Sequence, residues 1–158
     1  MSVQLQFCFH MITLGIEGTA HSIGIGIVEN KQKNCIVLSN VIKTYHPESG
    51  GIHPREAANH HAEHVALLIE QALLKANTSL SSIDLVSFSQ GPGLGPCLRT
   101  AATAARALSL RIQKPIIGVN HCVAHLEIGR GTIHECTDPV LLYTSGANTQ
   151  VIAKKKKK

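Results

Sequence analysis

Three consecutive β patterns near the start of the chain constrain the fold more than any other feature of the sequence. Apolar residues alternate with small or polar ones in residues 12–16 and again in residues 23–27, and Gly18-Thr19-Ala20 lies between them. Such alternation places apolar side chains on one face of a strand, and a short glycine-containing turn joins two strands into a hairpin. After a second polar turn at residues 30–34, the segment CIVLSNVIK (35–43) predicts a third strand. We therefore expect three antiparallel strands in succession.

Strands and helices alternate in the part of the sequence that follows. Residues 55–76 contain no proline or glycine and carry apolar side chains at helical spacing, which predicts a long amphipathic helix. Its predicted apolar stripe consists of Ala58, Ala62, Val65, Leu68, Ile69, Ala72 and Leu73. A strand at 85–89, an alanine-rich helix at about 98–110 and a β-branched strand at 116–119, expected to be buried, come next, and a helix follows. The order βββαβαβα predicts an α/β fold with a mixed sheet flanked by helices.

Composition and charge exclude several classes of protein. A hydrophobic content of 44% over 158 residues suffices for one domain with an aliphatic core. Five of the 15 basic side chains form the run 154–158, and the others balance 10 acidic residues, so charge alone does not predict a nucleic-acid partner. Five cysteines without a CxxC pair indicate a reducing, cytoplasmic setting. No apolar run is long enough to span a membrane, and residues 1–10 lack a signal-peptide pattern.

Two histidines at the start of the last of these helices are the strongest candidates for metal ligands. His121 and His125 are four residues apart, and one helical turn takes about 3.6 residues, so both imidazoles lie on one face. Two neutral imidazoles at this spacing can bind one divalent metal ion, and Glu127 is a candidate to orient a ligand or act as a base. Cys122 follows His121, so the HExxH motif of zinc peptidases is absent, and we expect this thiol to pack inside. The alternative is a polar helix face without metal.

Three glycine-containing loops each follow a predicted strand. They are residues 17–20, 90–95 and 145–149, and their backbone amides are candidates to bind phosphate. The alternative is that the glycines only permit tight turns. The middle loop has neither the GK[ST] of a Walker motif nor the GxGxxG of a dinucleotide fold. Glu17 ends the first predicted strand, where a carboxylate can hold a metal-bound or attacking water, and it is therefore the candidate catalytic residue.

The long predicted helix carries three further histidines. His60, His61 and His64 lie beside Arg55 and Glu63, and His60 and His64 again have the spacing of a metal pair. We expect these histidines to form a solvated helix face. The competing interpretation is a docking surface for nucleic acid or a protein partner, because histidine and arginine can contact phosphates.

Five segments together resemble one known family. They are GIEGTA (15–20), PREAANHHAEH (54–64), SFSQGPGLGPCLRTAATAARALS (87–109), KPIIGVNHCVAHLEIG (114–129) and LLYTSGANTQVIA (141–153). In order and spacing they resemble the archaeal and eukaryotic tRNA N6-adenosine threonylcarbamoyltransferases, the catalytic subunits of KEOPS complexes, formerly named O-sialoglycoprotein endopeptidases. The resemblance implies the actin-like ASKHA fold, related to ribonuclease H, with a βββαβαβα unit in each of two lobes. It also implies transfer of a threonylcarbamoyl group from threonylcarbamoyl-AMP to N6 of adenosine 37 in tRNAs that read codons beginning with A.

The resemblance also implies roles for individual residues. His121 and His125, together with Tyr143, would ligate one divalent metal ion, Fe(2+) or Zn(2+), and an aspartate of the second lobe would complete the set. The substrate's phosphate and carbamoyl end would bind at Tyr143, Thr144, Ser145, Gly146 and Ala147. The family reads SGGNT where this chain reads SGANT, so Ala147 puts a methyl group where glycine allows close approach of the backbone. The implied partners are tRNA and KEOPS-type subunits, namely a kinase and a small dimerising protein.

We divide the chain into four predicted parts. They are an N-terminal extension (1–10), a first actin-like lobe (11–129), a linker with the opening strands of a second lobe (130–153) and a lysine tail (154–158). Family members are longer, so we expect a truncated chain with little or no transferase activity of its own. The alternative function is a non-catalytic binding module that docks onto KEOPS-type partners through the helices at 55–76 and 98–110. The former peptidase name has no support, because no general base lies between the two histidines.

Overall fold

A computed structural model of the chain describes residues 10–31, 34–133, 139–145 and 148–153. Its strands are β1 (His10–Glu17), β2 (Ser22–Lys31), β3 (Asn34–Thr44), β4 (Leu85–Gly91), β5 (Ile116–Asn120), β6 (Val140–Ser145) and β7 (Asn148–Ala153). Its helices are α1 (Pro54–Lys75), α2 (Gly95–Ile112) and α3 (His121–Thr132), with a 3-10 turn at Leu80–Ser82. The elements up to α3 follow the predicted order βββαβαβα, which is therefore confirmed.

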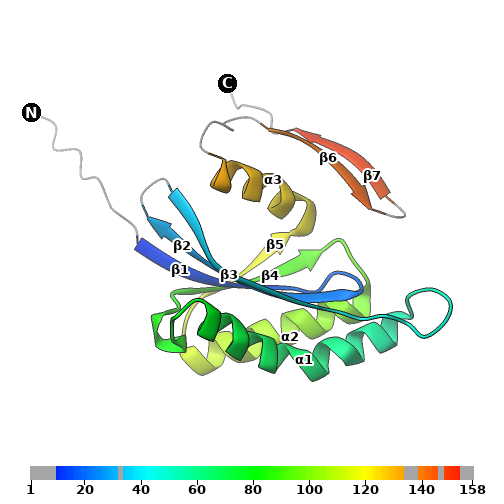
Figure 1. The fold of residues 1–158 in the computed structure, drawn as a ribbon, viewed down its shortest axis with the longest axis horizontal. Coiled ribbons are helices and arrows are strands. Elements are labelled where there is room, and N and C mark those ends of the chain that lie inside the picture. Colours follow the sequence, from blue (N-terminus) through cyan, green and yellow to red (C-terminus); the bar gives the residue numbers. More distant parts are fainter. Residues whose placement is uncertain (1–9, 32–33, 134–138, 146–147, 154–158) are drawn as a thin grey trace, which may run out of the picture.

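A five-stranded mixed sheet with the order β3-β2-β1-β4-β5 forms the body of the molecule. β2 pairs antiparallel with both β1 and β3, whereas β4 pairs parallel with both β1 and β5. Helices α1 and α2 cover one face of this sheet, and α3 lies over the other (Figure 1). The predicted α/β class, with helices flanking a mixed sheet, is confirmed.

The hydrophobic core lies between the sheet and the layer formed by α1 and α2. Its fully or almost fully buried side chains include Leu14, Ile16, Ile23, Ile25, Ile27, Leu68, Ala72, Ile83, Val86, Ala101 and Ala105. Burial of one leucine, isoleucine or valine side chain contributes about 1.5–3 kcal/mol. Ile16 of β1 shares this core with Ala101 and Ala105 of α2, and β1 ends at the next residue, Glu17.

Helix α1 confirms the predicted long helix, but its buried face differs from the prediction. Ala58, Leu68 and Ala72 are buried as expected, whereas Ala62 is exposed and His61 is fully buried. The core face of α1 thus runs through the buried positions 58, 61, 68 and 72 and the half-buried position 65, at spacings of three and four residues as a helix face requires. The prediction of a solvated histidine face is wrong for His61, because this residue is on the core side of the helix.

Several segments differ from their predicted burial or length. Strand β5 is not buried: Ile116 is 37% exposed and Ile117 is 50% exposed, because β5 is the edge strand of the sheet. The polar turn after β2 is shorter than predicted, since pairing between β2 and β3 continues to Lys31 and Asn34. The glycine-rich loop is also shorter, because β4 extends to Gly91 and α2 already begins at Gly95.

The last two strands, β6 and β7, form a separate antiparallel hairpin beyond α3 (Figure 1). This hairpin confirms the two predicted strands after the linker, and Val140, Leu142 and Val151 on it are exposed. Apart from His10, the predicted N-terminal extension lies outside the described residues, and so does the lysine tail. Within the described part of the chain, no helix combines the length and the apolar character needed to cross a bilayer.

Candidate functional site

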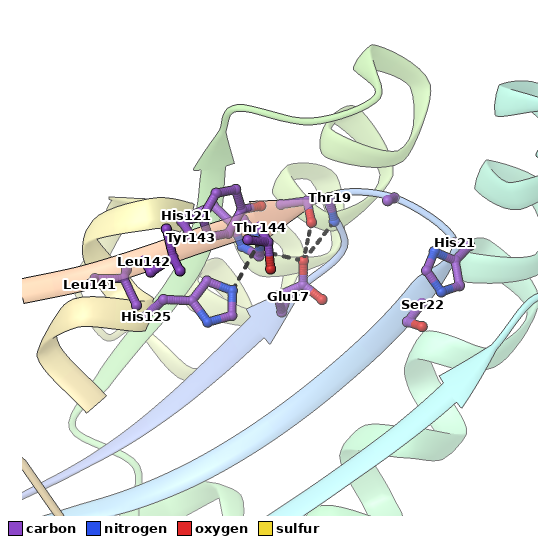
Figure 2. A pocket seen from close by; sticks show the side chains of 11 residues that line it. Glu17, Thr19, His21, Ser22, His121, His125, Leu141, Leu142, Tyr143 and Thr144 are labelled. Carbon is purple, nitrogen blue, oxygen red and sulfur yellow. Dashed lines mark hydrogen bonds and ion pairs between the residues drawn. The ribbon is translucent and has the colours of Figure 1, made fainter. Parts of the chain in front are cut away.

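An open pocket of about 510 Å³ lies where the end of β1, the start of α3 and strand β6 meet (Figure 2). Its lining residues are Glu17, Thr19, Ala20, His21, Ser22, His121, His125, Leu141, Leu142, Tyr143 and Thr144. Residues that are far apart in the sequence are thus combined in one site, and both histidines of the predicted metal pair belong to it.

The position of the histidine pair follows from the way α3 begins. Asn120 is the N-cap residue, and its Oδ1 accepts hydrogen bonds from the backbone N–H groups of Cys122 (3.0 Å) and Val123 (3.2 Å). Such a cap satisfies amides that have no partner inside the helix. Cys122 is buried, as predicted, so the first turn is anchored and His121 and His125 face the pocket.

Removal of this cap is expected to weaken α3 without changing the side chains of His121 and His125. We expect Asn120→Ala to lower the free energy of unfolding by about 1 kcal/mol, because two amides at the helix N-terminus lose their acceptor. Urea denaturation measures this loss. Asn120→Asp keeps an acceptor oxygen and should retain most of the stability, and equal losses in both variants would contradict the capping role.

The separation of the two imidazoles is compatible both with a hydrogen bond between the rings and with two ligands that share one metal ion. Nε2 of His121 lies 3.3 Å from Nε2 of His125, and the ring planes are 85° apart. Two nitrogens at 2.0–2.1 Å from one tetrahedral metal ion are about 3.4 Å apart, so the observed separation fits. Among the described residues, no group of three or more histidine, cysteine or carboxylate side chains is arranged to hold a metal. The pair therefore fits as part of a ligand set, with further ligands needed.

Glu17 approaches the ring nitrogen of His121 that His125 does not contact. Its Oε1 lies 3.7 Å from His121 Nδ1 and accepts hydrogen bonds from the N–H (2.8 Å) and the hydroxyl (2.5 Å) of Thr19. A carboxylate beside one imidazole nitrogen favours a proton there and leaves the other nitrogen as the metal ligand. All three contacts use Oε1, so Oε2 is not engaged by any of them. The predicted strand-end carboxylate thus belongs to the site.

Burial lowers the pKa of His121, and the negative charge of Glu17 opposes this shift only in part. A histidine must be neutral to bind metal through its lone pair, and a lowered pKa keeps the imidazole neutral at pH 7. The surroundings of His121 therefore favour the neutral imidazole, which is the form that metal binding requires.

Burial also lowers the pKa of His60 and of His61, relative to the ordinary histidine value of 6.5. A histidine with a lowered native pKa binds fewer protons in the folded state than in the unfolded state. We therefore expect the free energy of unfolding to fall as the pH drops from about 6.5 to about 5, and to be nearly constant between about 7 and 8. Urea midpoints across this range measure the effect. A stability that is constant or rises on acidification to pH 5 would contradict it.

Strand β6 brings Tyr143 and Thr144 to the pocket. The ring of Tyr143 is centred 5.5 Å from that of His125 and 6.0 Å from that of His121, and Figure 2 shows the three rings close together. Of the remaining predicted substrate-binding residues, Ser145 ends β6, where its backbone pairs with Asn148. Gly146 and Ala147 lie outside the described residues. Of the five predicted substrate-binding residues, Tyr143 and Thr144 thus line the pocket that contains the histidine pair.

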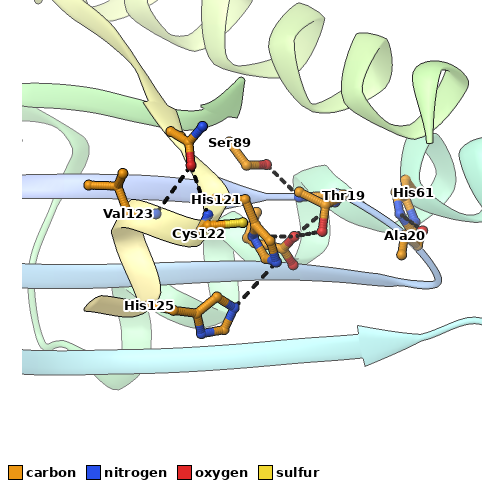
Figure 3. A network of polar contacts seen from close by, with 11 residues as sticks. Thr19, Ala20, His61, Ser89, His121, Cys122, Val123 and His125 are labelled. Atoms are coloured by element: carbon orange, nitrogen blue, oxygen red, sulfur yellow. Dashed lines mark hydrogen bonds and ion pairs between the residues drawn. The ribbon is translucent and has the colours of Figure 1, made fainter. Parts of the chain in front are cut away.

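Two sequence-based expectations are not met at the site. Glu127 is not among the pocket residues, and its carboxylate accepts hydrogen bonds of 2.7 and 2.8 Å from Arg130. Two amides of the first glycine-containing loop are already used, since Gly18 N–H donates to Ser89 Oγ (3.1 Å) and Thr19 N–H donates to Glu17 (Figure 3). These contacts favour a tight turn over a phosphate-binding loop.

The role of Thr19 as the donor that holds Glu17 was not predicted from the sequence. His21 and Ser22, which line the same pocket, were not predicted either. The spacing of Glu17 and Thr19, two residues apart in a turn, is the one local signal that was available, because side chains at such positions commonly bond to the nearby backbone. His21 and Ser22 have no comparable pattern around them.

Comparison with known proteins places the sequence in one family. The family model described as tRNA N6-adenosine threonylcarbamoyltransferase (TsaD) matches residues 36–158. A Thermococcus kodakarensis protein named tRNA N6-adenosine threonylcarbamoyltransferase is 57% identical over 143 residues, which are 90% of this chain and 42% of that protein. A Methanocaldococcus jannaschii protein, named as a probable bifunctional tRNA threonylcarbamoyladenosine biosynthesis protein, is 55% identical over 94% of this chain and 26% of its own length. The chain thus spans less than half of these relatives.

Among solved structures, YeaZ from Pseudomonas aeruginosa resembles this chain in fold. The two superpose with a TM-score of 0.59 at 12% sequence identity, over 91% of this chain and 65% of YeaZ. At such low identity the similarity concerns the fold alone, and it agrees with the ASKHA, ribonuclease H-like architecture expected from the sequence.

Proposed function

This chain belongs to the tRNA N6-adenosine threonylcarbamoyltransferase family, and we propose that it forms the first lobe of such an enzyme. The proposed reaction transfers a threonylcarbamoyl group from threonylcarbamoyl-AMP to N6 of adenosine 37 in tRNAs that read codons beginning with A. tRNA and threonylcarbamoyl-AMP are thus the proposed substrates, and the cytoplasm is the proposed location.

One observation carries this proposal: His121 and His125 face each other at 3.3 Å in a pocket that also contains Glu17 and Tyr143. We assign the two histidines and Tyr143 as ligands of one divalent ion, iron or zinc. When bound, such an ion supplies Lewis acidity that stabilises negative charge on phosphate or carbonyl oxygens of the substrate. Histidine ligands suit either metal, so the donor set is compatible with both.

Glu17 has two roles in this proposal. Through Oε1 it orients His121, and through Oε2 it accepts a hydrogen bond or a proton from a molecule in the pocket. As the amine of adenosine bonds to the carbamoyl carbon, the amine loses a proton and the AMP phosphate leaves. Glu17 is the carboxylate among the described pocket residues, which makes it the candidate acceptor for that proton.

The turn after β6 is assigned to the phosphate and carbamoyl end of the substrate. Tyr143 and Thr144 already line the pocket, and Ser145, Gly146 and Ala147 continue the chain from there. The methyl group of Ala147 is expected to weaken substrate binding relative to the glycine of the family pattern.

A chimera tests this function, because the chain spans only 42% of the Thermococcus kodakarensis relative. In the chimera, residues 11–153 replace the aligned segment of that relative. With tRNA and threonylcarbamoyl-AMP, we expect the chimera to form the modified nucleoside and the chain of 158 residues alone to form none. His121→Ala in the chimera should abolish the reaction, whereas His21→Ala, at the same pocket, should leave most of it. Full activity of the His121→Ala chimera would refute the proposal.

A second candidate function is docking to protein partners through α1 and α2. Leu74 on α1 is 80% exposed and Leu110 on α2 is 79% exposed, so the side of these helices that faces away from the sheet has apolar side chains in contact with solvent. The proposed partners are KEOPS-type subunits, namely a kinase and a small dimerising protein. Complex formation with these purified subunits in the absence of metal would favour docking as a function in its own right.

A further inference from the structure

His61 is a polar residue at a position where the rest of the helix face is apolar. It lies on the core side of α1 and is 0% exposed, next to the turn that connects β1 with β2. A buried imidazole is destabilising unless its nitrogens have hydrogen-bond partners. Its contacts therefore indicate what the residue does.

The hydrogen bonds of His61 define its tautomer. Nε2 lies 3.0 Å from the carbonyl oxygen of Ala20, and since a carbonyl only accepts, Nε2 carries the proton and donates it (Figure 3). Nδ1 is then an acceptor, and Nδ1 of His60 lies 3.5 Å away in position to donate to it. Burial lowers the pKa of His61, which keeps the ring neutral in this arrangement.

The turn that His61 contacts is also held from two other sides. Ser89 Oγ accepts from the N–H of Gly18, and the N–H of Leu94 donates to the carbonyl oxygen of Thr19 at 2.7 Å. A methyl group on Gly18 would lie 3.4 Å from Cδ2 of His61, so the imidazole also packs against the turn. The conformation of this turn is thus determined by β4, the start of α2 and His61.

The same turn holds the carboxylate of the candidate site. Ala20, whose carbonyl His61 binds, directly follows Thr19, and Thr19 donates from both its N–H and its hydroxyl to Oε1 of Glu17. Oε1 in turn lies 3.7 Å from Nδ1 of His121. A continuous set of contacts therefore leads from His61 inside the molecule to the metal-binding pair in the pocket.

We propose that His61 is a positioning residue for the centre formed by Glu17, His121 and His125. By anchoring the carbonyl of Ala20 it holds Thr19 in the conformation that binds Glu17, and Glu17 then orients His121. The expected effect on metal binding rests on the proposed function, but the effect of His61 on the conformation of Thr19 can be measured without metal.

The test compares His61→Leu, which removes the donor, with His61→Gln, which restores an N–H donor on a side chain of similar reach. In the metal-free protein, we expect His61→Leu to shift the backbone amide resonance of Thr19 upfield, because its bond to Glu17 weakens. The affinity for Zn(2+) should fall about 10-fold, the lower end of the effect of removing an outer partner of a ligand. His61→Gln should restore both values at least in part.

Ser109→Ala is the matched control. Ser109 is also buried on a helix, and its hydroxyl donates to a backbone carbonyl, that of Lys114, at 2.6 Å. This variant should lose stability while the Thr19 resonance and the Zn(2+) affinity remain those of the wild type. An unchanged Thr19 resonance in His61→Leu would overturn the proposal, and so would an equal shift in Ser109→Ala.

A measurement on the wild-type protein keeps the proposal falsifiable if His61→Leu does not fold. Long-range nitrogen–proton spectra of the imidazoles should show His61 protonated at Nε2, and protonation at Nδ1 alone would overturn the proposal. If the Thr19 resonance shifts in His61→Leu but the wild-type protein binds no Zn(2+), the positioning role is supported and the metal site is refuted. Failure of the positioning role and failure of the proposed metal site are thus distinguishable.

Discussion

Substitution of His121 or His125 by alanine is expected to remove specific metal binding from this chain. The two Nε2 atoms lie 3.3 Å apart, and each variant leaves a single imidazole at the site. We expect the affinity for Zn(2+) to fall at least about 100-fold in each variant, because a lost ligand has a larger effect than a lost outer partner, which reduces affinity by roughly 10- to 100-fold. Competition titrations against a chromophoric chelator, on protein without a histidine tag and under reducing conditions, measure this effect.

His21→Ala is the control for that experiment. His21 lines the same pocket but is not part of the pair, so its loss should leave the affinity within a factor of about two of the wild type. If all three variants bind Zn(2+) as the wild type does, the pair is a polar helix face and the metal assignment is wrong.

Gly93→Ala is expected to disrupt the turn that holds Glu17. An added Cβ at Gly93 would lie 2.5 Å from the carbonyl oxygen and 2.9 Å from Cα of Thr19. These are backbone atoms of a turn that is fixed on several sides, so they cannot move aside as a flexible side chain would. We expect a loss of about 3 kcal/mol in the free energy of unfolding, at the upper end for overpacking. Urea denaturation measures it, and the Thr19 amide resonance should shift as well.

Gly95→Ala separates this steric effect from the general effect of replacing glycine. Gly95 is the first residue of α2, and an added Cβ there meets nothing within 4 Å. This variant should change stability by less than about 0.5 kcal/mol or increase it slightly, because alanine favours the helix. A Gly93→Ala protein as stable as Gly95→Ala would show that the turn yields easily, and the turn would then not be a rigid support for Glu17.

Local patterns in the sequence were sufficient for the elements and for the histidine pair. The alternation in residues 12–16 and 23–27 reports a strand directly, since neighbouring side chains point to opposite faces. Likewise, His121 and His125 face one way because a helix repeats every 3.6 residues. Both features depend on residues within one turn or one strand, so no knowledge of the tertiary structure is required.

Features that depend on the arrangement of elements could not be predicted. Ile116 and Ile117 have the composition of a buried strand, but their exposure follows from the edge position of β5 in the sheet order. The burial of His61 depends on which side of α1 meets the sheet, and apolar spacing alone placed Ala62 on the buried face instead.

The contacts within the site also join distant parts of the chain. β1 and β5 lie on either side of β4 and run parallel to it, so their carboxyl ends lie at the same end of the sheet. Glu17 ends β1, and α3 with His121 starts directly after β5, so the two residues come together there. Tyr143 joins the pair from a separate hairpin. The family resemblance identified His121, His125 and Tyr143 together, whereas the link through Thr19 to Glu17 emerged from the structure.

X-ray absorption on the chain loaded with one equivalent of Zn(2+) tests whether His121 and His125 bind one metal ion together. We expect scattering from two imidazole ligands at about 2.0–2.1 Å, with oxygen donors in the remaining positions. Their loss in His121→Ala would assign the signal to the pair. A spectrum dominated by sulfur ligands, or one without imidazole scattering, would contradict the claim that His121 and His125 form the metal-binding part of this lobe.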